Sequence, residues 1–400
     1  MKKFTKKGMF RAKSNKSITM EKTEKPRKLK KIIKNLILFI LLIVLTFSLI
    51  LKDQDLPQMA NIIRNVKKPY LLIGALAMCI YVICEATNIG RILKELGEKS
   101  TLLKNIKYTL IGFFFSSITP AASGGQPLEI YYMHRENIKV ANSTLALLMQ
   151  LCCMQIVTIT MGIVSAVIHF DVIKDGLVFF VILGIGLNSS ALILLLIAIF
   201  SKKLSKGLIN IAVKILKFLK IPKLEEKQEK LEKELQSYQE SAVYIKKHKM
   251  LMLKTLLTTA VQILVYYSVP YWVYRAFGFN TLTIWQLITL QALLYATVSG
   301  IPSPGAVGVS EGGFLGIFKN VFPTTIISSA MLLNRGINFY LLVLVSGIIS
   351  TINALKDKKE DNQKVAVEVA GNNIYENQEI NHINEKNEAC DNKLDDTTKK

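Results

Sequence analysis

Residues 119–129 read TPAASGGQPLE, and residues 303–313 read SPGAVGVSEGG. Each segment places a hydroxyl residue before a proline, continues with small residues and glycine, and contains a glutamate. Each lies between apolar segments of helical composition. Proline and glycine interrupt helices, and interrupted backbone at membrane depth is tolerated only where it is buried in protein or lines a cavity. Two matching interruptions in the two halves of a membrane chain therefore predict a transport site.

The composition predicts a polytopic membrane protein. Half of the 400 residues are hydrophobic and gather in long uncharged runs, although the formal net charge is +22. The basic excess lies beside these runs, where lysine typically marks the cytoplasmic side and contacts anionic lipid. We therefore interpret the charge as a signal of orientation and expect no direct binding of nucleic acid.

The apolar runs differ in length. A helix needs about 20 residues to cross a bilayer. Full spans are expected at 32–51, 69–92, 141–170, 176–200, 251–277 and 326–354. Shorter arms flank the two breaks, at 106–118 and 128–133 and at 284–301 and 314–322.

These lengths predict an all-α bundle, a polytopic membrane helix bundle with two inverted-topology halves. Each half contains a re-entrant hairpin made of a broken helix, so that the two hairpin tips meet near the membrane midplane. If one hairpin instead spans the membrane fully, the orientation of every later segment reverses.

Three regions are expected along the chain. Residues 1–31 form a basic cytoplasmic arm, residues 32–355 an integral membrane domain, and residues 356–400 a disordered polar tail. Residues 201–250 form a basic cytoplasmic loop with amphipathic helices near 204–219 and 224–245. Both termini are then cytoplasmic, and the protein lies in the cell membrane.

The five cysteines give no sign of metal or redox chemistry. No CxxC pair or Cys/His group has the spacing of a metal site, and cysteine in an apolar run is most often a packing residue. Ser123 and Ser310 resemble nucleophiles, but no His/Asp pair accompanies them. We therefore expect no metal, no cofactor and no catalytic residue.

Ionisable residues inside apolar segments are candidates for function because burying charge in a membrane is costly. They are Glu85, Glu129, Glu311 and Arg335. A short helix should begin after each break, with Gln126-Pro127 opening the first and Ser310 as N-cap of the second. The free amide groups of such helix starts attract anions.

Three groups of residues resemble a known family. They are Ser117 to Pro120 with Gly124 to Pro127 and Glu129, Pro302 to Gly305 with Gly308, Val309 and Glu311, and Arg335 with Tyr340 and Gly347. Over about residues 30–355 the chain resembles the membrane part of the lysylphosphatidylglycerol synthase/flippase family, also called flippase-like membrane proteins.

The resemblance implies lipid handling by residues 32–355. In two-part members a soluble domain transfers lysine from lysyl-tRNA to phosphatidylglycerol, and the membrane part moves the product to the outer leaflet. This gives resistance to cationic antimicrobial peptides. The residues after Ala354 are too few for a transferase domain, so we do not expect this chain to be an enzyme by itself.

The resemblance favours translocation of a phospholipid, either phosphatidylglycerol or an aminoacylated derivative. One alternative is a phosphatidylglycerol lysyltransferase, or a membrane subunit of one with a soluble aminoacyltransferase partner. Another is a structural or regulatory membrane protein that binds lipid without moving it.

We hypothesise that the lipid phosphate lies between the hairpin tips. Arg335 gives it a two-pronged contact, and Gly124, Gly125, Gly312 and Gly313 let it approach the backbone. Ser123 and Ser310 are also expected among the residues that bind the lipid. Glu129 and Glu311 then face a cationic head group or carry a coupling proton. A structural alternative stays open, in which the glutamates cap helices and Arg335 pairs with Glu85 or Glu311.

Overall fold

The computed structural model describes residues 55–119, 122–173, 177–201, 224–299, 301 and 303–357, together with residues 37, 40, 41, 44 and 48. Every regular element in these ranges is a helix. The chain forms two compact units, residues 1–347 and 348–400, and all contacts given below lie within the first. Outside the described residues lie the arm at 1–31, most of the expected span at 32–51, the segment at 204–219 and nearly all of the polar tail.

Within the described residues, five helical runs are long and apolar enough to cross a membrane. They are α3 (Lys68–Glu95), α6 (Val140–Ile168), α8 (Val178–Phe200), the α11–α12 run (Lys249–Ala276) and the run Ile327–Asp357. They coincide with the last five spans expected from the sequence. The prediction of a polytopic all-α bundle is therefore confirmed.

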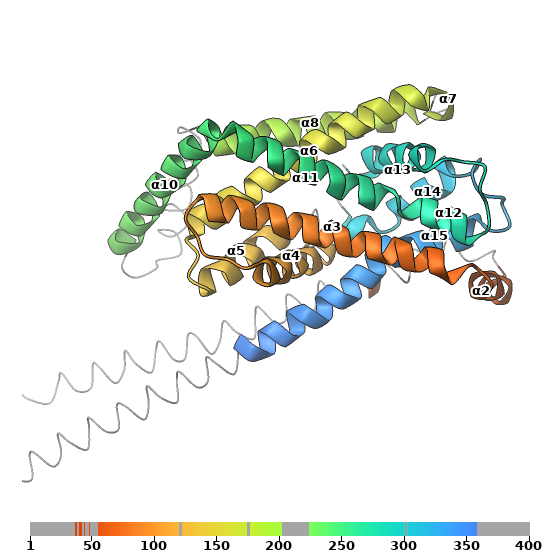
Figure 1. Ribbon diagram of the computed structural model, residues 1–400, viewed down its shortest axis with the longest axis horizontal. Coiled ribbons are helices and arrows are strands. Elements are labelled where there is room, and N and C mark those ends of the chain that lie inside the picture. The colour runs from red at the N-terminus through yellow and green to blue at the C-terminus, as the bar shows by residue number, and fades with distance from the viewer. Residues whose placement is uncertain are drawn as a thin grey trace, which may run out of the picture. The chain divides into compact units, whose positions relative to one another are not determined.

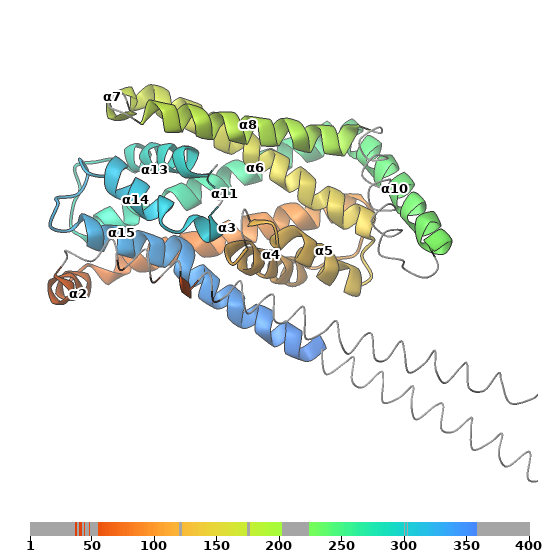
Figure 2. The same ribbon diagram turned by 180° about the vertical axis from the view of Figure 1, so that it is seen from behind.

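Two pairs of shorter helices accompany these runs. α4 (Leu102–Ser117) packs against α5 (Gly125–Arg135), and α13 (Ile284–Val298) packs against α14 (Val309–Ile317). The α4–α5 pair lies toward the end of the bundle that carries α10 (Leu224–Lys247), and the α13–α14 pair lies toward the other end (Figure 1). The view from behind shows the same separation (Figure 2). An inverted repeat requires this arrangement, but the inverted topology itself stays a prediction.

The boundaries of three elements differ from the prediction. α5 begins at Gly125 and α14 at Val309, so the glycines that follow each break are helical. The expected span at 251–277 is interrupted at Ser268, between α11 (Lys249–Tyr267) and α12 (Val269–Ala276). The cause is Pro270, which lacks an amide hydrogen and whose ring clashes with the preceding turn.

Sequence reasoning missed the helix α2 and a π-helical turn. α2 (Leu56–Arg64) is capped by Asp55, whose side chain accepts a hydrogen bond from the Gln58 amide at 3.0 Å. The π-helical turn η3 (Gly336–Tyr340) follows α15 (Ile327–Arg335) inside the expected span at 326–354. Such a turn rotates the following side chains around the helix and is frequent at functional sites.

Packing of the remaining helices follows from their apolar faces. In the central loop the structure has the helix α10, with Tyr238, Ala242 and Ile245 buried. The short α7 (Phe170–Ile173) links α6 to α8. A Cβ at Gly184 of α8 would meet the carbonyl oxygen of Ala296 in α13. Small residues allow this close approach between membrane helices.

Candidate functional site

A buried ion pair closes the second break. Arg335 Nε donates to Glu311 Oε1 at 2.8 Å, and the two side chains are 6% and 0% exposed. The carboxylate also accepts from the Tyr340 hydroxyl at 3.0 Å and from the Gly308 amide at 2.7 Å. Arg335 Nη2 donates to the Gly305 carbonyl at 3.0 Å. Both oxygens of Glu311 therefore have partners, and the pair ties the break to α15.

The backbone of the second break requires glycine at two positions. In the turn η2 (Pro304–Ala306), Gly305 has a φ of +60°, and Gly308 has a φ of +88°. Other residues rarely adopt such positive values. A Cβ on Gly305 would also meet the ring of Phe339. The break is thus shaped by its glycines as well as by the ion pair.

The prediction that Ser310 is the N-cap of α14 is wrong. Gly308 occupies that position, and Ser310 lies in the first helical turn. The reason is that the Glu311 carboxylate reaches back to the Gly308 amide and satisfies it, which makes a serine cap unnecessary.

A cavity of about 390 Å³ lies where the two breaks meet. Ser116 and Ala122 line it from the first break, and Ser303 and Ser310 line it from the second. Its wall includes three tyrosines from α3, α11 and α13, namely Tyr81, Tyr266 and Tyr295. Further polar lining comes from Gln291, Asn334, Arg335 and Asn338. The two breaks are about 180 residues apart in the sequence. The fold brings them together at one polar cavity.

Several polar atoms of this lining are buried without a hydrogen-bond partner in the described part of the chain. They are Gln291 Oε1, Ser303 Oγ, Asn334 Oδ1 and Asn338 Oδ1. A buried polar atom without a partner costs about 1–3 kcal/mol. Four of them around one cavity indicate a chamber built for a polar ligand or water.

Sequence reasoning missed these amide side chains. Gln291, Asn334 and Asn338 stand inside apolar runs, which is the same signal that singled out the charged residues. Asn334 and Asn338 are also four residues apart, so one face of a helix carries both. They carry no charge, so the high cost of a buried charge does not single them out.

The first break is held by other means. Thr119 Oγ1 donates to the Phe115 carbonyl at 2.6 Å and accepts from the Gly124 amide at 2.9 Å. A Cβ on Gly125 would collide with Ser116 Oγ. The two glycines therefore allow α5 to start close against α4, and this packing role accounts for them without a phosphate. Pro120 and Ala121 lie outside the described residues.

Glu129 differs from Glu311 in its surroundings. It is 5% exposed, and its Oε2 has no hydrogen-bond partner among the described residues. Its carboxylate lies directly over Gly112 of α4, where a Cβ would collide with it. Glu85 of α3 is near enough to interact with it electrostatically. In the described segments no lysine or arginine forms a salt bridge with either acid.

Glu85 belongs to a chain of polar side chains. Gln262 Nε2 donates to Glu85 Oε2 at 3.1 Å, and Gln150 Nε2 donates to Gln262 Oε1 at 3.0 Å. These residues come from α3, α11 and α6, so the hydrogen bonds cross the middle of three long helices. Polar groups of this kind hold membrane helices together and also mark ion or substrate pathways.

The predicted site residues divide into two sets. Two line the cavity, Ser310 and Arg335. The others do not line it: Ser123, Gly124, Gly125, Glu129, Glu311 and Gly312. Arg335 pairs with Glu311, as the structural alternative foresaw, and not with Glu85. Because Nε and Nη2 of Arg335 are already engaged, a two-pronged contact with phosphate would require this pair to open.

The chain matches a known family over most of its length. Residues 32–346 fit the family described as the lysylphosphatidylglycerol synthase TM region. The chain belongs to this family. The resemblance expected from the two breaks is thereby confirmed. No curated protein matches the chain.

Membership and fold together establish a coarse function. The five long apolar helices and the family make this a multi-pass membrane protein related to lipid modification or transport. The head group, the movement of lipid and the orientation of the termini are matters for proposal.

Proposed function

We propose that the protein binds a phospholipid at the cavity between the two breaks and moves it between the membrane leaflets. The observation that carries this proposal is the cavity itself, a polar chamber inside an apolar bundle with unpartnered amides in its wall. Its volume of about 390 Å³ falls in the range of ligand pockets. The hydroxyl groups of a phospholipid head group can donate to the unpartnered amide oxygens of Asn334, Asn338 and Gln291.

An apolar groove beside the cavity supports a lipid over a soluble solute. The groove has a volume of about 460 Å³ and is lined by α3, α11, α12 and α13, with Ile80, Leu264 and Ile288 among its residues. Ile80 is followed in the chain by Tyr81, which lines the cavity. The same helices therefore offer a polar chamber on one side and an apolar groove on the other, as an amphiphile requires.

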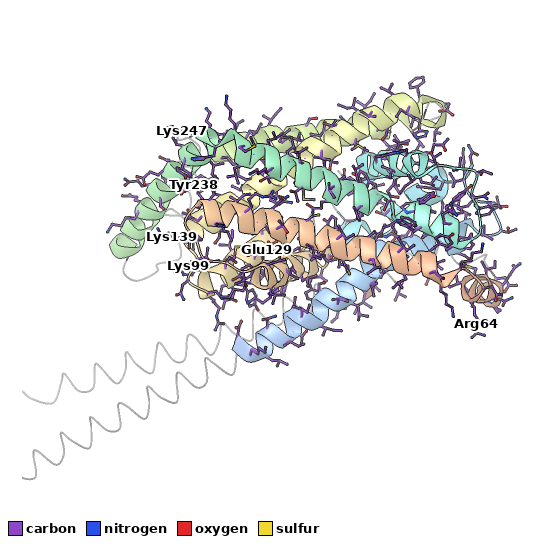
Figure 3. The ribbon with its side chains drawn as sticks, viewed as in Figure 1. Arg64, Lys99, Glu129, Lys139, Tyr238 and Lys247 are labelled. Carbon is purple, nitrogen blue, oxygen red and sulfur yellow. The ribbon has the colours of Figure 1, made fainter. Side chains whose placement is uncertain are left out.

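The charge distribution supports an orientation. Lys99, Lys139 and Lys247 lie at the end of the bundle near α10, and Arg64 lies at the opposite end (Figure 3). Because lysine-rich ends face the cytoplasm, we propose that the α10 end of the bundle faces the cytoplasm. The α4–α5 hairpin then enters from the cytoplasm and the α13–α14 hairpin from outside. An even number of spans, counting the first expected one, would keep both termini cytoplasmic.

The head group in this proposal is phosphatidylglycerol or an aminoacylated derivative. Ser310 offers its hydroxyl to a phosphate, Arg335 offers its guanidinium once the pair with Glu311 opens, and the amides suit the hydroxyls of a glycerol group. In this scheme the lipid makes no direct contact with four of the residues predicted from the sequence, because they do not line the cavity: Ser123, Gly124, Gly125 and Gly312.

Leaflet exchange in proteoliposomes tests the proposal. Phosphatidylglycerol with a fluorescent head-group-proximal label is reconstituted with the protein, and a membrane-impermeant quencher reports the outer-leaflet fraction over time. Asn338→Leu should slow exchange at least tenfold while the protein stays folded. The matched control is Asn61→Leu on α2, an exposed position outside the cavity. Absence of exchange in the wild type with any phospholipid would refute translocation.

The family description favours one second candidate, a membrane subunit of a phosphatidylglycerol lysyltransferase. In that case a soluble aminoacyltransferase partner supplies the transfer of lysine from lysyl-tRNA. Membranes from cells that express this chain with and without such a partner would distinguish the two. Lysylphosphatidylglycerol formed only with both proteins, without leaflet exchange, would support the subunit.

A further inference from the structure

Glu85 and Glu129 are acidic groups without a basic partner in the interior of the described bundle. Glu129 is 5% exposed, and Glu85 is partly buried on α3. By contrast, Glu311 pairs with Arg335, and Glu136, which follows α5, pairs with Lys104 and Lys107. An ionised carboxylate buried without a cation is strongly unfavourable. Glu85 and Glu129 are close enough to interact electrostatically. Ionising both carboxyl groups therefore costs additional free energy from charge repulsion.

Unpartnered polar atoms around the two acids point to a missing ligand. Glu129 Oε2 and Gln150 Oε1 are buried and have no hydrogen-bond partner in the part of the chain that the structure describes. Gln150 is 2% exposed and leads through Gln262 to Glu85. A proton on the Glu129 carboxyl would turn its unpartnered acceptor oxygen into a donor. The smallest ligand that changes the hydrogen bonding of this carboxyl is therefore a proton.

The cluster is connected to the cavity by two tyrosines. Tyr81 precedes Glu85 by one helical turn, interacts with it and lines the cavity. The Tyr81 ring lies 5.5 Å from the Tyr266 ring, measured between centroids. Tyr266 lines the cavity as well, together with Arg335. One helical turn and one ring contact therefore connect Glu85 to the wall of the cavity.

We propose that Glu85 and Glu129 hold an exchangeable proton whose uptake and release are coupled to lipid movement. The inference rests on the proposed translocation and adds an energy source to it. One carboxylate takes up a proton from one side of the membrane and becomes a neutral acid, and it releases the same proton to the other side. No electron is transferred and no other bond changes. The charged or titratable groups that interact with the pair or with its link to the cavity are Tyr81, Tyr266, Tyr295 and Arg335.

In this proposal Glu129, after the first break, carries the coupling proton, and Glu311, after the second break, does not. Glu311 also lies after a break, but its charge is balanced by Arg335 and its oxygens are occupied. Protonation of Glu311 would leave Arg335 buried without a counter-charge. Glu129 has neither obstacle.

A pH gradient across proteoliposome membranes tests the coupling. If one proton moves with each lipid, a gradient of one pH unit shifts the steady-state leaflet ratio of the labelled lipid about tenfold. Glu129→Gln and Glu85→Gln should abolish this shift. The matched control is Glu136→Gln, a glutamate at the lysine-rich end that pairs with Lys104 and Lys107 and should leave the shift unchanged.

Infrared spectroscopy gives a second readout that does not depend on transport. At neutral pH the wild type should show a protonated-carboxyl carbonyl band that weakens in Glu129→Gln or Glu85→Gln and persists in Glu136→Gln. Absence of the band in folded wild-type protein would overturn the proposal.

The outcomes distinguish a failure of proton coupling from a failure of lipid translocation. Leaflet exchange whose steady state does not depend on the pH gradient overturns the coupling but not the proposed translocation. A response to a sodium gradient at constant pH would also overturn it, in favour of a metal cation. No exchange under any gradient overturns both.

Discussion

The two breaks have nearly the same sequence pattern and opposite electrostatic surroundings. Glu311, after the second break, has Arg335, Tyr340 and a backbone amide on its oxygens. Glu129, after the first break, has one oxygen without a partner among the described residues, and the charged group that interacts with it is another acid, Glu85. The same residue type thus lies in a closed ion pair in one half and, among the described residues, without a basic partner in the other.

The difference shows how a repeat can divide its roles. A clamp needs satisfied hydrogen bonds and a fixed charge, because breaking a buried pair is costly. A group that gains and loses a proton needs the reverse. The following predictions test that division, and the first has the largest expected effect.

Glu311→Gln should destabilise the protein by about 3–5 kcal/mol, because it leaves Arg335 buried without a counter-charge. Thermal unfolding in detergent, followed by tryptophan fluorescence or size-exclusion recovery, measures this. Glu129→Gln is the matched change in the other half and should alter stability by less than about 1 kcal/mol, because no ion pair is lost. Equal effects of the two substitutions would remove the distinction between the breaks.

Gly112→Ala should cost about 1–3 kcal/mol, because the new Cβ collides with the Glu129 carboxylate. Gly312→Ala is the control, since a Cβ there meets nothing within 4 Å and the helix gains propensity. Removing the obstacle in Gly112→Ala/Glu129→Ala should recover part of the loss, as a double-mutant cycle measures. Additive losses would show that Glu129 does not lie against α4.

Asn338→Leu should change stability by less than about 1 kcal/mol, because the amide oxygen it removes has no partner among the described residues. The same variant should lose leaflet exchange. Asn188→Leu is the opposite case, since its amide donates to the Gly184 carbonyl and to Ser299 Oγ, each at 2.7 Å. Asn188→Leu should therefore unfold at a lower temperature than the wild type. A strong loss of stability in Asn338→Leu would make its role structural.

Glu136→Gln should have the smallest effect, at most about 1 kcal/mol at neutral pH. Desolvation raises the pKa of Glu136, but hydrogen bonds from Lys104 and Lys107 outweigh it and lower the pKa below the ordinary value of 4.5. A lowered pKa in the folded state gives stability that is present above that ordinary value and is lost as the pH falls through the folded-state value. The difference between Glu136→Gln and wild type should therefore vanish in acid, which unfolding between pH 3 and pH 7 would check. A difference that grows in acid would contradict the ion pair.

Sequence alone determined the positions of five long apolar helices and of the two breaks. Long apolar runs fixed five spans to within a few residues, and proline with glycine located both breaks and their short arms. These features act locally, since hydropathy and helix interruption depend on a residue and its near neighbours. The four ionisable positions were visible for the same reason.

Only the tertiary structure decided what each of these residues does. It paired Arg335 with Glu311 rather than with Glu85, and it placed Gly124 and Gly125 against α4 rather than at a ligand. It also gathered Gln291, Asn334 and Asn338 around one cavity. Such partnerships join residues far apart in the chain, up to 177 positions for Glu85 and Gln262. Local pattern carries no information on them, because they follow from how packed helices rotate and cross.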